Sequence, residues 1–439
     1  MKLHNMKKLT LAVAVALSMG MGLVGCAGTG SSVAGTQATV SQQALKLSPL
    51  GWDSFNREQL NNLIATYGNS NPGYNPNKRP YAVFDWDNTT VFLDINEATL
   101  IYQLENLIFG ATPEQLNKAL RMNIPSTDFG KDYNNAAGQP VNIDKIAPDV
   151  VESYTWLYNN YKGLKGNKSL DEVKKSPHYM NFITKVRYMY EAIGGTFDVA
   201  VSYPWVTYLY AGMTEAEVGK MTSQTADWQL TQPIESVKWT SPTNPPGKAG
   251  VVSVSWKNGL RMVPEMQELY DVLRRSGIDV YVCSASFIGV IREISANPKY
   301  GYNNPHHMAY AMELERDTNG RYLPEFRKGY DQTQGKGKTT TINHFIADKY
   351  GYGPVLVAGD SEGDQNMLAD YGDMKIGLII NRLRSPKNLV GQQSKMAVDS
   401  YGKPDAKYLL QGRDDNKGIF IPNQLHFRLG SKEGQALRQ

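Results

Sequence analysis

The chain has 439 residues, of which 41% are hydrophobic and 20% carry a charge, and this length exceeds that of one typical domain. The 46 basic and 42 acidic side chains nearly balance, which agrees with a soluble protein. The composition therefore gives no reason to expect binding to nucleic acid or to an anionic surface.

The N-terminus has the pattern of a secretory signal. Three lysines precede an apolar stretch over residues 9–24, which is too short for a membrane-spanning helix and typical of a signal peptide. The stretch ends in Leu23-Val-Gly-Cys26, which resembles the bacterial lipobox, whereas an ordinary signal would contain this cysteine only by chance. The resemblance implies that residues 1–25 are removed and that Cys26 is acylated. Cleavage would remove three lysines and leave a formal charge of about +1.

The lipobox resemblance also implies a location. Ala27 follows the cysteine where an aspartate would retain the protein at the inner membrane, so we expect a lipid-anchored protein of the bacterial envelope, at the outer membrane and facing the periplasm. Residues 26–48, rich in small and polar residues at their start, predict a flexible tether. We expect no disulfide, because Cys26 would be lipidated and Cys283 lies in a predicted core strand.

The run Tyr81-Ala-Val-Phe-Asp-Trp-Asp-Asn-Thr-Thr90 ends a short apolar strand with two carboxylates, Asp85 and Asp87. Side chains two residues apart share one face of a strand, so both acids would lie at its carboxyl end, where open parallel α/β sheets bind ligands. A nucleophilic carboxylate needs a second group nearby that protonates the departing alkoxide, and Asp87 is placed for this role. The alternative is a strand that runs into an Asp/Asn-rich turn.

Nearly two hundred residues separate this run from the next strand of the same kind, far more than a crossover helix requires. We therefore predict a second domain inserted over residues 95–262, within a core formed by residues 49–94 and 263–439. Its spacing of apolar residues is largely helical. Many aromatic residues crowd this insertion, where they form either a helical core or a cage for a quaternary ammonium group: Tyr154, Trp156, Tyr158, Tyr161, Tyr203, Trp205, Tyr208, Tyr210 and Trp228.

Residues 266–273, with a glycine stop at Gly277, predict a helix that leads back into the core. Residues 278–284 predict a strand that ends in Ser284, and a helical pattern follows from Phe287. Ser284 would then lie at a helix N-terminus, which attracts a phosphate through free N–H groups and the helix dipole. The alternative is that Ser284 only caps the helix. Residues 309–326 predict a β-hairpin.

The segment Gly335-Lys-Gly-Lys338 opens another predicted helix, whose first apolar residue is Ile342. A lysine here would neutralise the charge of a phosphate and of the nucleophile, although lysines at such positions are commonly just solvated. We prefer Lys338 to Lys336, because Lys338 lies four residues before Ile342.

A buried type of strand over residues 354–359 ends in Asp360, and Asp364 follows four residues later. Grouped carboxylate oxygens of this kind suit Mg²⁺. Residues 375–380 predict one more strand, and residues 408–421, with their Asp-Asp-Asn-Lys-Gly turn, predict a closing hairpin.

In chain order, these segments supply Asp-x-Asp, Ser, Lys and Gly-Asp-x-x-x-Asp, an order that resembles the haloacid dehalogenase-like hydrolase superfamily over residues 75–94 and 260–385. The resemblance implies an α/β fold with a Rossmann-like parallel sheet and a mainly helical cap inserted after the first strand. It also implies the site roles: Asp85 as nucleophile, Asp87 as general acid and base, Ser284 and Lys338 as phosphate ligands, and Mg²⁺ held by Asp85, the Asp87 carbonyl and Asp360 with support from Asp364.

Asp87 distinguishes between the activities of that superfamily. A halide leaves without a proton, whereas an alkoxide leaving phosphorus needs one, so Asp87 favours phosphoryl transfer over dehalogenation. Mg²⁺ would offset the repulsion between an anionic carboxylate and an anionic phosphate. We therefore expect a Mg²⁺-dependent hydrolase that acts on a small organic phosphomonoester through an aspartyl-phosphate. The alternatives are a phosphotransferase to an alcohol and a non-catalytic envelope lipoprotein; the latter should lack a motif residue, and none is missing.

Three core segments, around residues 84–97, 265–302 and 409–420, resemble a branch that includes bacterial phosphorylcholine phosphatases and phosphoserine phosphatase-like proteins. The resemblance implies phosphorylcholine as a candidate substrate. From the lipobox, we expect the lipid anchor to be the protein's only membrane contact. Glu97, twelve residues after Asp85, could face a cationic head group; the alternative is a surface glutamate on a helix.

Overall fold

A computed structural model describes residues 43–438 of the chain. The predicted signal peptide, Cys26 and most of the predicted tether lie outside these residues. Within the part that is described, no helix is long and apolar enough to cross a membrane.

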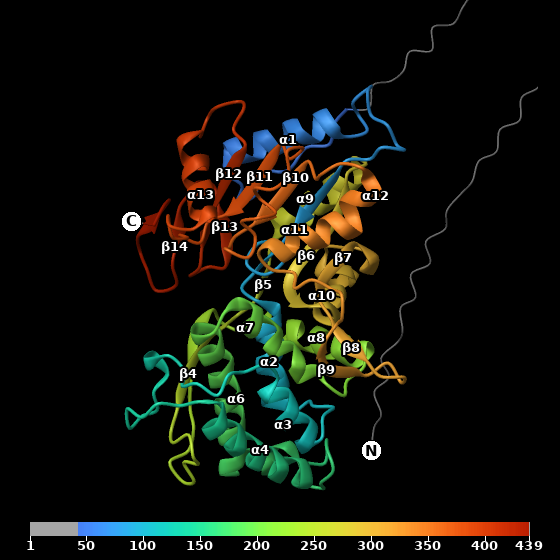
Figure 1. The fold of residues 1–439 in the computed structure, drawn as a ribbon. Coiled ribbons are helices and arrows are strands. Elements are labelled where there is room, and N and C mark those ends of the chain that lie inside the picture. The colour runs from blue at the N-terminus through green and yellow to red at the C-terminus, as the bar shows by residue number, and fades with distance from the viewer. Residues whose placement is uncertain (1–42, 439) are drawn as a thin grey trace, which may run out of the picture. The chain divides into compact units, whose positions relative to one another are not determined.

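A mainly parallel sheet forms the core (Figure 1). Its strands are β1 (Tyr81–Phe84), β6 (Asp279–Phe287), β7 (Ala309–Met312), β10 (Leu356–Gly359), β11 (Ile376–Ile380), β12 (Tyr408–Asp414), β13 (Ile419–Ile421), β14 (His426–Phe427) and β15 (Gly434–Gln435). The order is β15-β14-β12-β11-β10-β1-β6-β7, and β13 pairs with β12. The strand β1 pairs in parallel with β10 on one side and with β6 on the other, so the first core strand lies inside the sheet. This arrangement confirms the predicted α/β fold.

The side chains of β1 alternate between the two faces of the sheet, and all four are buried. Tyr81 and Val83 pack against α11 (Lys336–Ile342) and α13 (Leu389–Asp399). Ala82 and Phe84 face a second cluster, formed with α1 (Ser54–Tyr67), α9 (Pro264–Arg275) and α10 (Ile288–Ala296). Helices thus cover both faces, as an apolar parallel strand requires.

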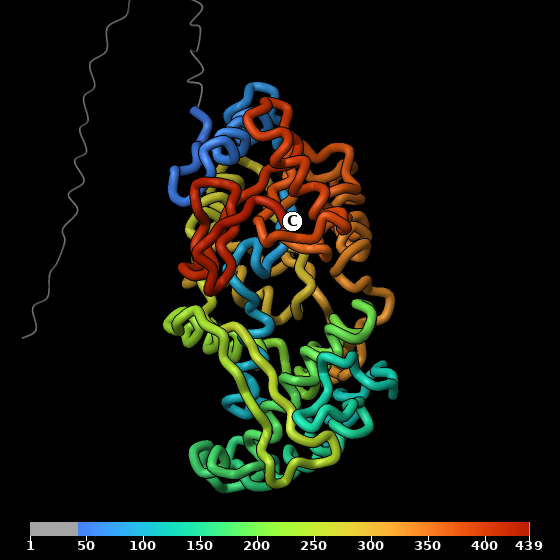
Figure 2. Tube along the Cα trace, turned by 90° about the vertical axis from the view of Figure 1, so that its left-hand side faces the viewer, coloured from blue at the N-terminus to red at the C-terminus, as the bar shows by residue number. Residues whose placement is uncertain are grey.

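The chain leaves the core through β2 (Val91–Phe92) and returns through β5 (Arg261–Met262), and these two strands pair antiparallel. The inserted residues bury a hydrophobic cluster of their own, and Figure 2 shows their helices and one long hairpin gathered together. The elements are α2 (Ile95–Asn106), α3 (Pro113–Arg121), α4 (Ile143–Asn160), α5 (Leu170–Lys174), α6 (Pro177–Thr196), α7 (Val199–Trp205), α8 (Glu215–Gln229), β3 (Glu235–Thr240) and β4 (Ser253–Asn258). The exact domain boundaries remain predictions.

Short elements complete the described chain. They are the 3-10 segments Lys131–Tyr133, Val206–Tyr210, Pro298–Tyr300 and His306–Met308, a π-helical turn at Asn343–Ala347, α12 (Asp348–Tyr350), and the strands β8 (Leu314–Arg316) and β9 (Tyr322–Phe326). The predicted helix over 266–273, the strand over 375–380 and the closing hairpin over 408–421 are all present.

One prediction about local structure is wrong, and a second is correct only in part. Ser284 does not lie at a helix N-terminus, because β6 continues to Phe287 and α10 begins only at Ile288. The aromatic ring of Phe287 packs against Tyr210 and Tyr322, with ring centroids 4.6 and 4.8 Å away, which holds the chain extended beyond the serine.

The second correction concerns the hairpin predicted over residues 309–326. Its first part, β7, is a parallel strand that pairs with β6 at the edge of the sheet. Only β8 and β9 form the antiparallel pair. The small buried side chains of Ala309 and Ala311 fit the strand to the core, so it joins the sheet and not the hairpin.

Candidate active site

The residues predicted to carry chemistry converge on one cavity of about 470 Å³ at the carboxyl ends of the core strands. Because β1 lies between β10 and β6, the segments that follow these strands meet at one edge of the sheet. Six predicted residues line the cavity: Asp85, Asp87, Ser284, Lys338, Asp360 and Asp364. Residues almost three hundred positions apart therefore form a single site.

Lys338 lies between two carboxylates. Its Nζ is 2.6 Å from an oxygen of Asp85 and 2.6 Å from an oxygen of Asp364, and its side chain is 1% exposed. Burial by itself would lower the pKa of the amine, but Asp364 and Asp85 outweigh it and raise the pKa of Lys338 above its ordinary value, so the amine stays charged. Lys336 is exposed, so the structure favours Lys338 as the residue of the site.

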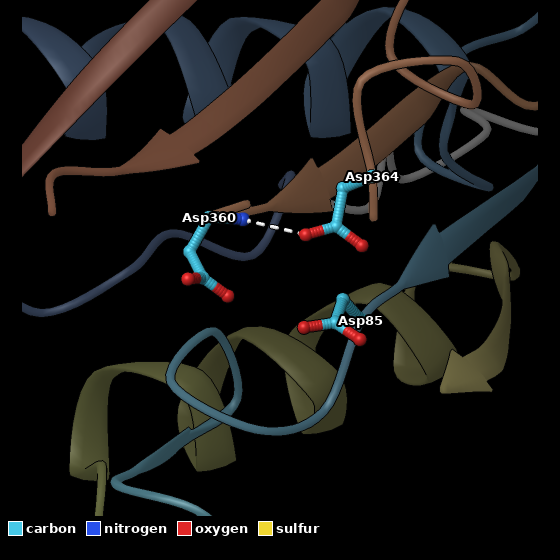
Figure 3. A group of neighbouring side chains, drawn as sticks. All are labelled: Asp85, Asp360 and Asp364. Atoms are coloured by element: carbon cyan, nitrogen blue, oxygen red, sulfur yellow. Dashed lines mark hydrogen bonds between the residues drawn. The ribbon is translucent and has the colours of Figure 1, made fainter. Parts of the chain in front are cut away.

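Asp85, Asp360 and Asp364 form a cluster of carboxylates, shown in Figure 3. One oxygen from each lies within 4.8 Å of the others, and all three residues are buried. The hydroxyl of Thr89 lies 3.0 Å from oxygens of both Asp85 and Asp360. Burial and the charge of Asp364 raise the pKa of Asp85 to about 8. Three buried oxygen donors that repel one another fit a hard divalent cation such as Mg²⁺.

Asp87 is held apart from this cluster. One of its carboxylate oxygens accepts a hydrogen bond from the Ser286 hydroxyl at 2.5 Å, and the other accepts one from the Ile95 N–H at 2.7 Å. Burial, with a contribution from the charge of Asp94, raises the pKa of Asp87 well above its ordinary value. A carboxyl group that retains its proton is suited to act as a general acid.

Ser284 lines the cavity although no helix begins there. Its hydroxyl accepts a hydrogen bond from the Ser286 N–H at 3.1 Å, and its carbonyl accepts one from the Thr333 hydroxyl at 2.6 Å. These contacts fix the backbone of β6 around Ser284, where the pairing with β7 shifts register. Its role as a phosphate ligand remains a prediction.

The sequence reasoning missed two arginines that contact the metal-ligand candidate Asp360. Arg382 and Arg384 lie 2.9 and 3.0 Å from its Oδ2. Burial favours the protonated acid, but the two guanidinium groups outweigh burial and lower the pKa of Asp360, which therefore stays ionised. The signal was available, because both arginines follow directly after β11, another parallel strand that ends at the same edge.

A second group of residues lines the cavity, and we call it the far side. Asp94 caps the start of α2, Tyr190 and Glu191 lie on α6, and Tyr203 lies on α7. Together they add carboxylate and phenol groups to the lining of the cavity.

Glu97 does not line this cavity. Its carboxylate forms an ion pair with Arg187, whose guanidinium lies 5.0 Å from the ring centroid of Tyr190. The prediction that Glu97 faces the substrate is therefore not supported: the acid faces a buried arginine, and Asp94, three residues earlier, lines the cavity.

The aromatic residues of the insertion are mostly core residues. Tyr203 alone among the nine named from the sequence lines the cavity. The others belong to the two main hydrophobic clusters or pack against them: Tyr154, Trp156, Tyr158, Tyr161, Trp205, Tyr208, Tyr210 and Trp228. A cage built from the whole set is therefore wrong.

Comparisons with known proteins give two informative relatives. The chain is 23% identical over 398 residues to a phosphorylcholine phosphatase of Pseudomonas aeruginosa, covering 85% of this chain and 92% of that protein. It is 33% identical to a conserved protein of unknown function from Anaerococcus prevotii, whose crystal structure matches with a TM-score of 0.81 over 86% of this chain and 97% of the other.

A phosphoserine phosphohydrolase-like protein from Francisella tularensis is 10% identical and superposes with a TM-score of 0.29, over 69% of this chain and 87% of that one. This likeness is too low to support an argument. No family model matches the chain.

Proposed function

We propose that this chain is a phosphatase of the haloacid dehalogenase-like type, which hydrolyses a small organic phosphomonoester through an aspartyl-phosphate on Asp85, with Mg²⁺ as its metal. The observation that carries the proposal is the contact of Lys338 with Asp85 and Asp364 beside Asp360. This arrangement gathers a nucleophile, a cation for the phosphate and a set of metal donors in one buried cluster.

The reaction has two steps. A carboxylate oxygen of Asp85 forms a bond to phosphorus while the bond from phosphorus to the ester oxygen breaks, and the proton of Asp87 moves to the departing alkoxide. Asp87, now ionised, then removes a proton from water as the water oxygen attacks phosphorus and the bond between phosphorus and the Asp85 oxygen breaks. Phosphate leaves, and Asp85 and Asp87 return to their starting states.

Lys338 and the carboxylate cluster supply the electrostatic part of the mechanism. The ammonium group of Lys338 orients Asp85 and offsets the negative charge of an incoming phosphate. Asp85, Asp360 and Asp364 would hold Mg²⁺, which would reduce the repulsion between nucleophile and phosphate. Thr89, through its contacts with Asp85 and Asp360, keeps the two acids at a fixed spacing.

Phosphorylcholine is our proposed substrate. Its support is the similarity to a phosphorylcholine phosphatase and the chemistry of the far side of the cavity. There, Asp94 offers a carboxylate, and Tyr190 and Tyr203 offer aromatic rings that attract a quaternary ammonium group.

A comparison of two substrates tests this choice. Phosphorylcholine and its neutral isostere 3,3-dimethylbutyl phosphate have nearly the same shape and differ in charge. We expect kcat/KM to be higher for phosphorylcholine by about tenfold or more. Asp94→Asn should reduce that preference. The effect of Asp94 on the pKa of Asp87 acts on both substrates alike and therefore cancels in their ratio. Equal kcat/KM values for both substrates would refute a cationic substrate.

The catalytic proposal is tested separately. Asp85→Asn should abolish both turnover and the trapping of a phosphoenzyme on nitrophenyl phosphate, and removal of divalent metal with EDTA should abolish turnover reversibly. Asp360→Asn should weaken Mg²⁺ binding measured by calorimetry. Wild-type hydrolysis by Asp85→Asn would contradict the assignment of the nucleophile.

We also propose that the protein is anchored by a lipid on Cys26 and faces the periplasm. The support is the signal sequence with its lipobox. Labelling with a palmitate analogue should mark the wild type and not Cys26→Ser, and the variant should appear in the soluble fraction.

A further inference from the structure

Arg413 is a buried charge that no step of the proposed mechanism uses. It lies at the end of β12, its side chain is 1% exposed, and it is among the largest fully buried side chains of the described chain. Burying a guanidinium is costly unless its donors are satisfied. The hydrogen-bond partners of Arg413 therefore indicate why the charge is buried there.

The donors of Arg413 reach the loop that carries the catalytic acids. One terminal nitrogen donates to the carbonyl oxygen of Asn88 at 3.1 Å, and the other lies 3.4 Å from the Asn88 side-chain oxygen. Asn88 directly follows Asp87, lines the cavity and has a φ of 63°, the left-handed conformation that asparagine adopts more readily than most residues. The backbone that positions Asp87 is thus held from the C-terminal part of the chain.

The third nitrogen of the Arg413 guanidinium, Nε, is held by a carboxylate. Its Nε donates to Asp415 at 2.8 Å, and the same carboxylate oxygen lies 3.0 Å from the Nε2 of His426. Arg413 is thereby oriented by a carboxylate that is itself buried, and its guanidinium plane is set before any substrate arrives.

The same part of the chain also contacts the link to the inserted residues. The guanidinium carbon of Arg413 lies 4.2 Å from the ring centroid of Phe92 in β2. The turn between β12 and β13 packs close by, since a Cβ added at Gly418 would lie 2.8 Å from Arg261 and 3.4 Å from Phe92. Both link strands, β2 and β5, are therefore in contact with the C-terminal hairpin.

We infer that Arg413 is a positioning residue, which holds the Asn88 backbone and the β2 link so that the carboxyl group of Asp87 reaches the ester oxygen of the substrate. The inference rests on the proposed function of Asp87 as the acid of the first step. A displacement of Asp87 by about 1 Å costs little in folding but much in proton transfer. The residue acts through geometry and does not itself touch the phosphate.

The leaving group of the substrate separates this role from a purely structural one. Nitrophenolate leaves phosphorus without a proton, whereas a choline-type alkoxide needs one from Asp87. Rapid-quench measurement of phosphoenzyme formation gives the rate for each substrate. Arg413→Lys keeps the charge and loses the fork of donors. In this variant, we expect the rate for the choline-type substrate, divided by the rate for nitrophenyl phosphate, to decrease by a factor of about 10 to about 100.

Leu60→Ala is the control for lost stability, because Leu60 is a buried apolar residue of α1 that does not line the cavity. It should leave the ratio unchanged, since a smaller folded fraction reduces the amount of phosphoenzyme for both substrates equally and does not change either rate. If Arg413→Lys does not fold, the double variant Arg413→Met/Asp415→Leu takes its place. It removes the hydrogen bonds from Arg413 to Asn88 and does not leave Asp415 as an unpaired buried charge. A ratio within twofold of wild type in the folded variant overturns the inference.

The wild type in the same rapid-quench experiment tests the proposed function itself. A wild type that forms no phosphoenzyme with either substrate overturns both the mechanism and the role of Arg413. A wild type that forms phosphoenzyme, together with an unchanged ratio in the variant, overturns the role of Arg413 alone.

Discussion

The hydroxyl of Ser286 donates a hydrogen bond of 2.5 Å to the carboxyl group of Asp87. Ser286 belongs to the extension of β6 beyond Ser284, so this contact exists only because the strand continues where the sequence pattern predicted a helix. The correction to the fold thus explains how Asp87, the proposed general acid, is held in place.

Replacing Ser286 by alanine should remove one of the two contacts that orient Asp87. We expect kcat for a choline-type ester to fall by about tenfold with little change in KM, because the contact matters for proton transfer and not for substrate binding. Steady-state kinetics measures both values. Ser295→Ala, at a buried serine of α10 outside the cavity, should retain wild-type kinetics. A rise in KM with constant kcat would instead assign Ser286 to substrate binding.

The two lysines of the Gly335-Lys-Gly-Lys338 segment provide a matched pair. Lys338→Met should reduce kcat/KM by about a hundredfold to a thousandfold, because the variant removes the charge that contacts Asp85. Lys336→Met alters an exposed side chain two residues away on the same helix and should remain near wild type. Loss of activity in Lys336→Met with retention in Lys338→Met would reverse the assignment.

Two residues of the candidate site could be placed from the sequence because each follows directly after an apolar strand. Parallel strands end at one edge, so Asp85 and Asp360 could be brought together without any knowledge of side-chain packing. Lys338 lies on α11 and is identified by its place in the motif order. The same rule, applied to the strand predicted over 375–380, would have found Arg382 and Arg384.

Other features depended on contacts between distant segments. The prediction that Glu97 faces a cationic head group uses only its distance along the chain from Asp85. Its partner in the structure, Arg187, is ninety residues away on another helix. The extension of β6 depends on the packing of Phe287 against Tyr210 and Tyr322. Local periodicity carries no information about such partners, so the far side of the cavity could not be predicted from spacing alone.

The raised pKa of Asp85 predicts how stability depends on pH when metal is absent. Its ordinary value is 3.8, and burial with the charge of Asp364 raises it to about 8. The folded state therefore binds this proton more tightly than the unfolded state, so the free energy of unfolding falls as pH rises from about 4 to about 8. Thermal melting in EDTA followed by circular dichroism should show this decline.

Asp85→Asn isolates the contribution of that one group, because an amide does not ionise. At pH 8 in EDTA, we expect the variant to melt about 2 °C or more above the wild type, with a difference that shrinks as pH falls toward 4. Mg²⁺ should raise the melting temperature of the wild type at pH 8 through its binding energy. Parallel pH profiles for the two proteins would show that Asp85 is not the group responsible.

The inserted residues contain a buried ion pair whose removal should destabilise them. The Nζ of Lys185 on α6 lies 2.7 Å from Asp149 on α4 and 2.8 Å from the carbonyl oxygen of Pro246, and the two charged side chains are 0% and 3% exposed. Both oxygens of Asp149 also accept backbone N–H groups, from Lys248 and Ala249. The pair thus joins two helices to the loop that precedes β4.

Lys185→Met leaves the Asp149 carboxylate buried without its cation, so we expect the free energy of unfolding to fall by about 3–5 kcal/mol. Urea denaturation followed by tryptophan fluorescence measures the change. The control is Lys395→Met, which breaks an exposed pair with Asp399 and should cost less than about 1 kcal/mol. Equal losses in the two variants would mean that α4 and α6 are held together by their apolar side chains, with no net contribution from the charges between them.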